Sequence, residues 1–478
     1  MSRERFATGI GALSEGALRA AHSPIPAVAL NAAGSKAAAA AAVEASARRL
    51  QPRPWAAGLH GARDTKRILV YSHDTFGLGN IRRMLGICKR LVAADPHLSV
   101  LLISGSPLVH AFPMPPQIDY IKLPCLARTL EGAYEVKFLG VGYDELIRLR
   151  TTLITSTILD FSPDLILVDK KPFGVSNELS PGLQLLHCRG SRAKVVLLLR
   201  DILDDPETTT ATWTRNHYHE AVRSFYDRIL VVGSREIFDL AAEYNFPACS
   251  ERKLQFCGYL RRDRSSRTRE QVRRELGVGD EPLVLVTSGG GEDGYQLLAN
   301  YVEGFRQLRP DQRPKTLLIC GPEMAEPYRQ RLREAAGCPG LIVQDFNNDM
   351  IGCMDAADLV VSMAGYNTVC EILSTHRRAI VVPRVRPVQE QLIRAERMAR
   401  QGLLRMIHPD QLTPRTLMSA VTEELSASHG RARGGYRVDL EGMSHVVRCL
   451  HALLQERNPV PMDGLLGPPA FAQAAFAQ

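Results

Sequence analysis

The sequence lacks a long apolar run. Its longest ones are Ala37–Val43 and Val195–Leu199, far short of the ~20 residues that a membrane-spanning helix needs. We therefore expect no transmembrane segment. The composition of a collagen, a disulfide miniprotein or a mainly disordered chain is also missing, because 45% of the 478 residues are hydrophobic and 23% are charged. These proportions are typical of a soluble globular protein.

Paired cysteines are missing as well. None of the ten cysteines forms a CxxC pair, and several lie inside apolar runs, as Cys320 does in Leu317–Gly321. This pattern indicates buried free thiols in a reducing compartment rather than disulfides or zinc ligands. We expect a cytoplasmic protein without a metal site.

The chain has no strong excess of charge of either sign. Lys and Arg number 59 and Asp and Glu number 51, which gives a net charge of +8. This modest excess favours anionic partners but does not distinguish phosphate, lipid headgroup and nucleic acid. No stacking aromatic side chains interleave with basic clusters, so we expect no nucleic-acid partner.

Both ends of the chain differ from the rest. Residues 1–60 contain 19 alanines, seven basic residues and three acidic ones, which resembles an organelle transit peptide and fits a disordered extension or an upstream start codon equally well. Residues 459–478 carry four prolines and indicate a flexible tail. The predicted organisation is an extension at 1–62, domains at 63–260 and 261–457, and a tail at 458–478.

Between the ends, short apolar runs alternate with longer amphipathic segments. β-branched runs bounded by Gly, Pro and Asp are typical of buried parallel strands, and their alternation with helices predicts an α/β fold with two doubly wound, Rossmann-like domains. The charged segment Arg261–Glu270 separates the domains, and we interpret it as a solvated linker. The predicted strands are Arg67–Ser72, Leu98–Ile103, Leu165–Val168, Val195–Leu199, Ile229–Val232, Leu283–Val286, Thr316–Ile319, Leu341–Val343, Leu359–Val361 and Ala379–Val382.

The first strand leads into a glycine loop. Gly77 and Gly79 follow strand Arg67–Ser72, and a helix is predicted from Ile81. Glycines let a ligand approach the backbone, and a helix N-terminus favours an anion. A tight turn without a ligand explains the pattern equally well. Arg82 stands where the dinucleotide fingerprint has its third small residue, so that motif is absent.

A second glycine loop, Thr287–Gln296, follows strand Leu283–Val286. Gly289, Gly290 and Gly291 expose consecutive N–H groups beside the Ser288 hydroxyl, and such a nest can hold a diphosphate. No Lys-Ser/Thr pair follows, which excludes the Walker loop. Because three successive glycines cost conformational entropy, we favour a ligand site over a packing role.

Two further motifs follow the next strands. In Ser362–Glu371 a turn at Ala364 and Gly365 opens a helix, where Glu371 can accept both hydrogens of a ribose diol. An acid that stabilises the helix dipole is the alternative. In Pro383–Ala395, Gln389, Glu390 and Gln391 open a helix and can bond sugar hydroxyls, although plain capping also places such residues there.

These motifs, in this order, resemble the C-terminal half of the family 28 glycosyltransferases. The stretch Gln344–Glu371 carries the resemblance with an aromatic-x-x-Asp-Met loop, an Ala-Ala-Asp helix end, a strand, a glycine turn and a Glu. The match covers roughly residues 280–405 well and the N-terminal half only through the Gly-Leu-Gly loop. It implies a GT-B architecture and metal-independent, inverting transfer of a hexose or N-acetylhexosamine. The donor is a UDP-sugar as co-substrate, with no cofactor.

The resemblance also implies where the substrates bind. The donor lies on the C-terminal domain, and the acceptor enters near Gly77–Asn80, with Asp169 and Lys170 opposite. The resemblance places the nucleobase beside Phe346 and Asn347 and the ribose on Glu371. It places the diphosphate on Ser288, Gly289 and Gly290, above the turn at Gly365 and Tyr366. The sugar would contact Gln391, with Gln389 or Glu390 near it.

One position departs from the family pattern. The residue after the Gly-x-Gly loop is usually a histidine, a candidate catalytic base, and here it is Asn80. Asparagine cannot take up a proton at neutral pH. The base is then His73, Asp74 or Asp169, or the loop only binds. His73 follows the first strand and can titrate near pH 7.

Other functions remain open on the sequence. The departure at Asn80 motivates a non-catalytic UDP-sugar-binding protein, and sugar-nucleotide 2-epimerases share the two-domain architecture. The hydroxyl acceptor is unknown. The basic charge and the family suggest a lipid-linked acceptor and peripheral contact with the inner face of an anionic membrane. The acidic run at Asp201, Asp204 and Asp205 resembles a manganese motif of another transferase fold, but we expect loop and cap roles for it.

Overall fold

The computed structural model describes residues 65–73, 79–129, 133–335, 337–427 and 437–456. The predicted extension at 1–62 and the tail at 458–478 lie outside these described residues. So do two of the predicted site residues, Asp74 and Gly77. In the described part of the chain no helix has both the length and the apolar character needed to cross a bilayer.

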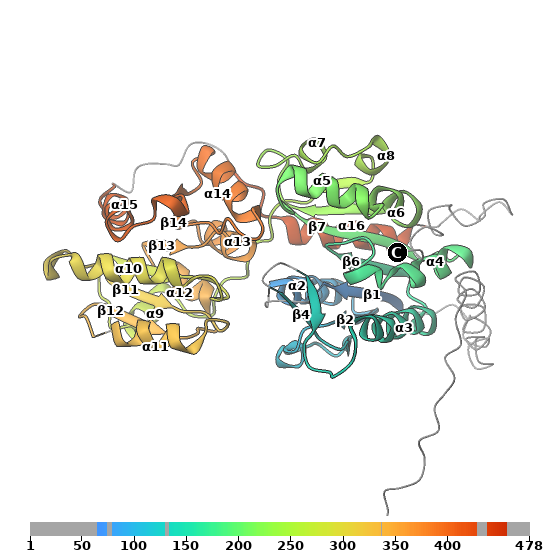
Figure 1. Cartoon of the computed structure of the whole chain (residues 1–478), viewed down its shortest axis with the longest axis horizontal. Coiled ribbons are helices and arrows are strands. Elements are labelled where there is room, and N and C mark those ends of the chain that lie inside the picture. Colours follow the sequence, from blue (N-terminus) through green and yellow to red (C-terminus); the bar gives the residue numbers. More distant parts are fainter. Residues whose placement is uncertain (1–64, 74–78, 130–132, 336, 428–436, 457–478) are drawn as a thin grey trace, which may run out of the picture. The chain divides into compact units, whose positions relative to one another are not determined.

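The first half contains a seven-stranded parallel sheet with the order β3-β2-β1-β6-β7-β8-β9 (Figure 1). Its strands are β1 (Lys66–Ser72), β2 (Leu98–Ser104), β3 (Ile118–Lys122), β6 (Leu165–Asp169), β7 (Lys194–Arg200), β8 (Arg228–Val232) and β9 (Leu254–Phe256). An antiparallel pair stands apart from it, formed by β4 (Leu126–Arg128) and β5 (Tyr134–Val136). The helices of this half are α2 (Gly79–Ala94), α3 (Tyr143–Phe161), α4 (Ser180–Cys188), α5 (Pro206–Arg215), α6 (Tyr218–Phe225), α7 (Leu240–Glu243) and α8 (Ala248–Glu251).

The second half repeats the design with a six-stranded parallel sheet in the order β12-β11-β10-β13-β14-β15. Its strands are β10 (Leu283–Thr287), β11 (Lys315–Ile319), β12 (Leu341–Gln344), β13 (Leu359–Ser362), β14 (Arg378–Val381) and β15 (Arg405–Met406). Its helices are α9 (Arg269–Glu275), α10 (Tyr295–Gln307), α11 (Glu326–Ala335), α12 (Met350–Ala356), α13 (Tyr366–Thr375), α14 (Glu390–Arg400) and α15 (Pro414–Ser426).

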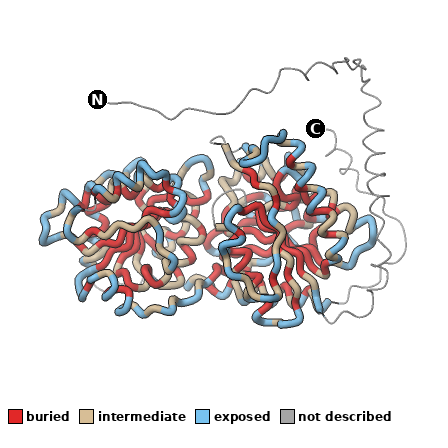
Figure 2. Tube along the Cα trace, turned by 90° about the horizontal axis from the view of Figure 1, so that it is seen from below, coloured by how far each residue is buried: buried red, intermediate tan, exposed pale blue. Residues whose placement is uncertain are grey.

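The strands are buried on both faces. Ile68 and Val70 of β1 belong to one apolar cluster, and the intervening Leu69 and Tyr71 belong to another. Figure 2 shows the buried residues concentrated on the strands of each half and the exposed ones along outer helices and loops. This explains why the strands are continuous apolar runs, as expected for parallel sheets covered by helices on both sides.

All ten predicted strands are confirmed, each within one residue at either end. The strands that the sequence did not reveal lie at sheet edges or in the separate pair, for example Ile118–Lys122 and Arg405–Met406. These segments are short or mix polar with apolar residues, so they carry no apolar run to recognise. The doubly wound α/β class is confirmed.

The last helix, α16 (Gly442–Gln455), differs from the predicted domain division. The second domain was predicted to run to residue 457, but α16 packs against α2 of the first half. Leu260 and Glu441 form an isolated antiparallel bridge, and the Tyr259 N–H donates to the Asp439 carbonyl at 2.8 Å. The chain therefore returns to the first half, because the apolar side of α16, with Val446 and Leu450, joins the core cluster there.

The segment Arg261–Glu270 is solvated as predicted at six of its ten residues, but ion pairs also hold it in place. Arg267 pairs with Asp349 at 2.9 Å, and Arg269 pairs with Asp358 at 2.6 Å. Both arginines are partly buried. The charges of this segment therefore fix it against the second half of the chain.

Candidate functional site

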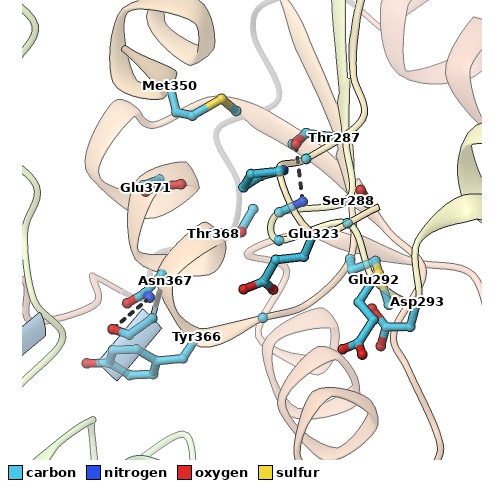
Figure 3. A pocket seen from close by; sticks show the side chains of 18 of the residues that line it. Thr287, Ser288, Glu292, Asp293, Glu323, Met350, Tyr366, Asn367, Thr368 and Glu371 are labelled. Carbon is cyan, nitrogen blue, oxygen red and sulfur yellow. Dashed lines mark hydrogen bonds between the residues drawn. The ribbon is translucent and has the colours of Figure 1, made fainter. Parts of the chain in front are cut away.

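A pocket of about 250 Å³ lies at the carboxyl ends of β10 and β13 (Figure 3). These strands are neighbours, with Thr287 opposite Ser362. The chain continues from β10 to β11 on one side and returns to β13 on the other. Ligands of open α/β sheets bind at such a switch point, because the two connections leave a gap between them. Five lining residues come from the first half: Gly79, Asn80, Arg82, Arg83 and Arg200.

The glycine loop after β10 forms one wall. Gly289 has a φ of +72°, and a side chain there would face the Thr368 hydroxyl. Gly291, with a φ of +102°, instead packs so closely that a Cβ would lie 2.5 Å from the Cys320 carbonyl oxygen. The first glycine is thus open to the pocket, whereas the third is needed for packing. The three glycines, which the sequence predicted to act together as one nest, therefore have different roles.

The Ser288 hydroxyl does not point at the pocket as a free donor. It is buried and donates to the Cys320 carbonyl at 2.6 Å. The residue still lines the pocket, together with Gly289 and Gly290. A bound anion would therefore meet backbone N–H groups of this loop rather than the serine proton. Thr368, in the first turn of α13, supplies a hydroxyl on this wall that sequence reasoning missed.

Three carboxylates stand at the rim of this wall, namely Glu292, Asp293 and Glu323. Desolvation raises the pKa of both Glu292 and Glu323 above the ordinary value. Neighbouring carboxylates add to the shift, whereas Arg384 opposes it at Glu292 and Lys137 and Arg82 oppose it at Glu323. Asp293 is balanced by Arg384 at 3.1 Å. Negative charge here opposes an anionic ligand, so these residues limit the affinity that the backbone N–H groups provide. The sequence motifs had pointed only to the glycines.

Helix α13 forms the base of the pocket. Gly365 is its N-cap residue in an extended conformation, and the helix begins at Tyr366. Its unpaired N–H groups and dipole favour an anion at this end. Glu371 lies on the same helix and lines the pocket. Its backbone carbonyl accepts from the Thr375 hydroxyl, whereas its carboxylate has no hydrogen-bonding partner among the described residues. Burial raises its pKa, and Arg262 and Arg82 partly oppose this shift.

Tyr366 and Asn367 connect this helix to the first half of the chain. The Tyr366 hydroxyl donates to the Val232 carbonyl at 2.9 Å, and its ring stacks on Tyr259. The Asn367 side chain donates to the Gly79 carbonyl at 3.2 Å and accepts from Arg262 at 2.7 Å. Both side chains line the pocket, but their polar atoms hold the fold together.

The start of α14 brings Glu390 and Gln391 to the pocket, whereas Gln389 is exposed and does not line it. Burial would raise the pKa of Glu390, but Arg200, Arg394 and Arg384 outweigh it and lower the pKa to about 2. The closest of these partners is Arg200 of the first half, at 3.0 Å. Glu390 is therefore an ionised side chain already committed to arginines.

Gln391 retains a free donor on the pocket side. Its Oε1 accepts from the Arg384 N–H at 3.1 Å, and its Nε2 faces the Gly365 turn. Because the oxygen is occupied, the side chain offers N–H groups to a ligand. The structure thus separates three neighbouring residues that the motif could not rank.

The far end of the pocket is lined by Phe346 and Asn347. Phe346 is 43% exposed, an unusual state for a large aromatic ring. The Asn347 side chain donates to Gln344 at 2.9 Å and accepts from the Asp349 N–H at 2.8 Å. Its amide therefore shapes the loop, and the exposed ring is the surface available for stacking on a nucleobase.

Two of the predicted bases, His73 and Asp169, do not line the pocket. His73 is fully buried, and its Nε2 lies 3.2 Å from the Tyr134 hydroxyl. Asp169 is 1% exposed and accepts from Arg83 at 2.6 Å. Neither is placed to take a proton from a ligand in this pocket, because burial and the ion pair remove them from it.

Asn80, in contrast, does line the pocket. Its side chain donates to the His73 carbonyl at 2.6 Å and accepts from Arg83 at 3.2 Å. Both ends of the carboxamide are engaged. The asparagine thus closes the loop at the point where the family usually has a histidine.

The acidic run after β7 has the loop and cap roles expected for it. The Asp205 side chain accepts from the Thr208 N–H at the start of α5. Asp204 accepts from the Gln389 N–H at 2.8 Å, and Asp201 forms a bidentate pair with Arg394 at 2.8 Å to each oxygen. Within the described ranges, no group of three or more His, Cys, Asp and Glu side chains is arranged to hold a metal ion.

Sequence comparison agrees with the position of the pocket. Residues 283–434 match the family described as "Glycosyltransferase family 28 C-terminal domain". A UDP-N-acetylglucosamine–N-acetylmuramyl-(pentapeptide) pyrophosphoryl-undecaprenol N-acetylglucosamine transferase from Syntrophotalea carbinolica is 36% identical over 151 residues, which are 31% of this chain and 41% of the relative. The chain thus spans about two fifths of the length of that relative. The predicted resemblance to family 28 is confirmed for this segment.

Solved structures extend the likeness to both halves. MurG from Acinetobacter baumannii aligns with a TM-score of 0.50 and 18% identity, over 81% of this chain and 99% of MurG. A protein from Listeria monocytogenes that is described as a UDP-N-acetylglucosamine 2-epimerase aligns with a TM-score of 0.55 and 12% identity, over 84% of this chain and 100% of that protein. At these identities the likeness concerns the fold, and it confirms the predicted GT-B architecture.

Proposed function

We propose that this chain, with its family 28 C-terminal segment, transfers a hexose or N-acetylhexosamine from a UDP-sugar to a hydroxyl group. The observation that supports this most directly is the pocket at the switch point of the second sheet. It combines backbone N–H groups after β10, the N-terminus of α13 and the unpartnered carboxylate of Glu371. A diphosphate and a ribose diol are complementary to these groups.

In this proposal each wall has a separate task. The Gly289–Gly290 backbone and the first turn of α13 stabilise the negative charge that develops on the departing diphosphate. Glu371 accepts the ribose hydroxyls, and Gln391 donates to the sugar. Phe346 stacks on the base. Inversion at the anomeric carbon and independence from metal ions follow from the family resemblance and belong to the proposal.

A lipid-linked acceptor is the finer part of the proposal. Phe138 is 68% exposed and is followed by exposed Leu139 and Val141. Lys137, which precedes them, lowers the pKa of Glu323 at the pocket rim by its charge. An acceptor with an apolar tail can rest on the loop, and contact with the inner face of an anionic membrane would supply it.

The test of the donor site is calorimetric titration of wild type with UDP, GDP, dTDP and NAD, and of Glu371→Ala with UDP. We expect selective UDP binding that Glu371→Ala loses. Glu303→Ala, which removes an exposed carboxylate on α10 away from the pocket, is the control and should bind like wild type. Failure of every nucleotide to bind would refute the proposal. The acceptor is tested separately by flotation with anionic liposomes, where Phe138→Ser should weaken binding and Tyr328→Ser, at another exposed aromatic residue, should not.

Two other functions on this fold are favoured by particular residues. The pocket carboxylates Glu292, Glu323 and Glu371 favour a 2-epimerase, which needs acid and base groups beside the sugar. The closed carboxamide of Asn80 favours a UDP-sugar-binding protein without turnover. Product analysis separates the three: UDP released together with a glycosylated hydroxyl compound indicates transfer, an epimerised sugar indicates epimerisation, and binding without either indicates the last. Activity gained only by Asn80→His would also support the last.

A further inference from the structure

The last helix carries a cysteine that meets another cysteine at the edge of the first sheet. His445 and Cys449 lie four residues apart on α16 and therefore on the same helix face. The His445 Nδ1 lies 2.8 Å from the carbonyl oxygen of Cys257, the residue after β9. Cys449 accordingly lies on the helix face that packs against Cys257. Cys257 belongs to the large apolar cluster and Cys449 packs against that cluster, and each thiol is the largest influence on the pKa of the other.

The two thiols differ in access and in acidity. Cys257 is fully buried, whereas Cys449 is only partly buried. Cys257, with Gln255 and the nearby charges of His445 and Arg448, lowers the pKa of Cys449 below its ordinary value, although partial burial opposes this shift. The neighbouring Cys449 and burial raise the pKa of Cys257. A partly exposed, more acidic thiol beside a buried one is the arrangement of an attacking and a resolving cysteine.

The surrounding backbone holds this contact in place. The chain crosses between the halves twice, and the two passages lie side by side here. The Tyr259 N–H donates to the Asp439 carbonyl at 2.8 Å, and the Arg261 N–H donates to the Leu440 carbonyl at 3.2 Å. Gly442 then starts α16 so close to Gly258 that a Cβ would lie 2.4 Å from the Gly258 carbonyl oxygen. The helix cannot slide along the strand without breaking these contacts.

We propose that Cys257 and Cys449 form a reversible disulfide that fastens α16 to the first sheet in response to a small-molecule disulfide such as oxidised glutathione. The Cys449 thiolate attacks one glutathione sulfur and releases one glutathione thiolate. Cys257 then loses its proton and attacks Sγ of Cys449, which releases the second. Two protein thiols are oxidised, one glutathione disulfide is reduced to two thiols, and the proton from Cys257 passes to a released thiolate.

The bond would enclose the entire second half of the chain in one loop. Every residue from 258 to 448 lies between the two cysteines. Cross-linking over a long loop restricts the unfolded chain, so the oxidised protein should unfold at a higher temperature, by roughly 5 °C. The reduced and oxidised forms would differ in how firmly the chain returning from the second half is anchored.

Peptide mapping of the full chain tests the proposal. Cleavage after Lys and Arg places each cysteine alone in a short peptide, 254–261 and 449–457. After incubation with oxidised glutathione and blocking of free thiols, we expect these two peptides joined and separated again by dithiothreitol. The thermal shift should accompany the link. Cys188→Ser, which removes an exposed cysteine, should leave both unchanged, and Cys449→Ser should abolish both.

Several results would overturn the proposal. Cys449 carrying only glutathione, with Cys257 blocked as a free thiol, would show that the buried cysteine does not resolve the mixed disulfide. Recovery of both cysteines as free thiols at complete oxidation of Cys188 would show that the pair is inert. Because the mapping is done first on wild type, the answer does not depend on whether Cys257→Ser folds.

Discussion

Each half of the chain has a switch point at the carboxyl end of its sheet, but the acidic side chain beside it is ion-paired in the first half and has no such partner in the described part of the second. In the first half, β1 and β6 are neighbours at the switch point, and Asp169 at the end of β6 is paired with Arg83 at 2.6 Å. Both side chains are at most 2% exposed. In the second half, β10 and β13 meet in the same way, but the carboxylate of Glu371 beside them has no hydrogen-bonding partner among the described residues.

The difference shows that topology provides the gap and side chains decide its use. An ion pair of the chain itself satisfies the first edge, so it serves stability. At the second edge the Gly289 N–H already donates to the Thr287 hydroxyl at 3.2 Å. The first N–H groups of α13 and the carboxylate of Glu371 have no hydrogen-bonding partner among the described residues, which leaves them available to a ligand. The pocket is lined by both halves. Its wall in the second half has polar groups available to a ligand, whereas Asn80 and Arg83 of its wall in the first half are paired within the chain. Four substitutions test whether the two edges differ in this way.

The largest effect is expected from Asp169→Ala. It removes the carboxylate that pairs with the buried Arg83 guanidinium, so the free energy of unfolding should fall by about 3–5 kcal/mol. Urea denaturation measures this change. Asp311→Ala, which removes an exposed pair with Arg309, should change it by no more than about 1 kcal/mol. A small loss in Asp169→Ala would mean that the first edge is not closed by this pair.

Glu371→Ala should show the reverse behaviour. Loss of hydrogen bonds to a charged acceptor costs about 1.5–3 kcal/mol each, so affinity for UDP should fall roughly 10- to 100-fold. The free energy of unfolding should stay the same or rise, because burial already raises the pKa of this carboxyl and disfavours its charge. A strongly destabilised variant that still binds UDP would place Glu371 among the structural acids instead.

The ion pair between Glu390 of the second half and Arg200 of the first half should be sensitive to acid. Its folded-state pKa of about 2 lies below the ordinary value of ~4.3. The ion pairs with the arginines therefore stabilise the fold above pH ~4.3, and this contribution is lost as the pH falls towards 2. Denaturation at several pH values should show a smaller change over this window in Glu390→Gln than in wild type. Glu396→Gln, at an exposed pair on the same helix, should follow wild type.

The smallest effect is expected from Glu323→Gln. The raised pKa of Glu323 means that its charge appears only above the ordinary range of a glutamate and then opposes an anionic ligand. Affinity for UDP should therefore fall as this group ionises with rising pH. The variant should bind UDP about 2- to 5-fold more tightly at neutral pH and lose part of this pH dependence. Glu326→Gln, at a residue paired with Arg329, should not. Equal affinities of Glu323→Gln and wild type for UDP would show that the charge of Glu323 does not weaken binding.

The sequence predicts the wall of the pocket in the second half better than the wall in the first half, because the former depends on local features and the latter on distant partners. The strands and the glycine turns of the second half are local features, and the apolar runs and the Gly289–Gly291 loop mark them directly. The fate of His73 and Asp169 depends on Arg83 and Tyr134, which lie far from them in the sequence. No local pattern reports such partners. Arg200 and Thr368 escaped notice because nothing in their own segments distinguishes them from ordinary strand-end and helix residues.

The alternation of strands and helices, the two parallel sheets and the edge of each sheet at which a ligand can bind can all be predicted from the amino-acid sequence. These features follow from backbone geometry and from short-range apolar patterning. The return of α16 to the first half, the ion pairs of Glu390 with arginines and the lack of a partner for the Glu371 carboxylate among the described residues are seen only in the folded chain. Those outcomes depend on which charges become buried together, and burial of a charge is settled only when distant segments pack.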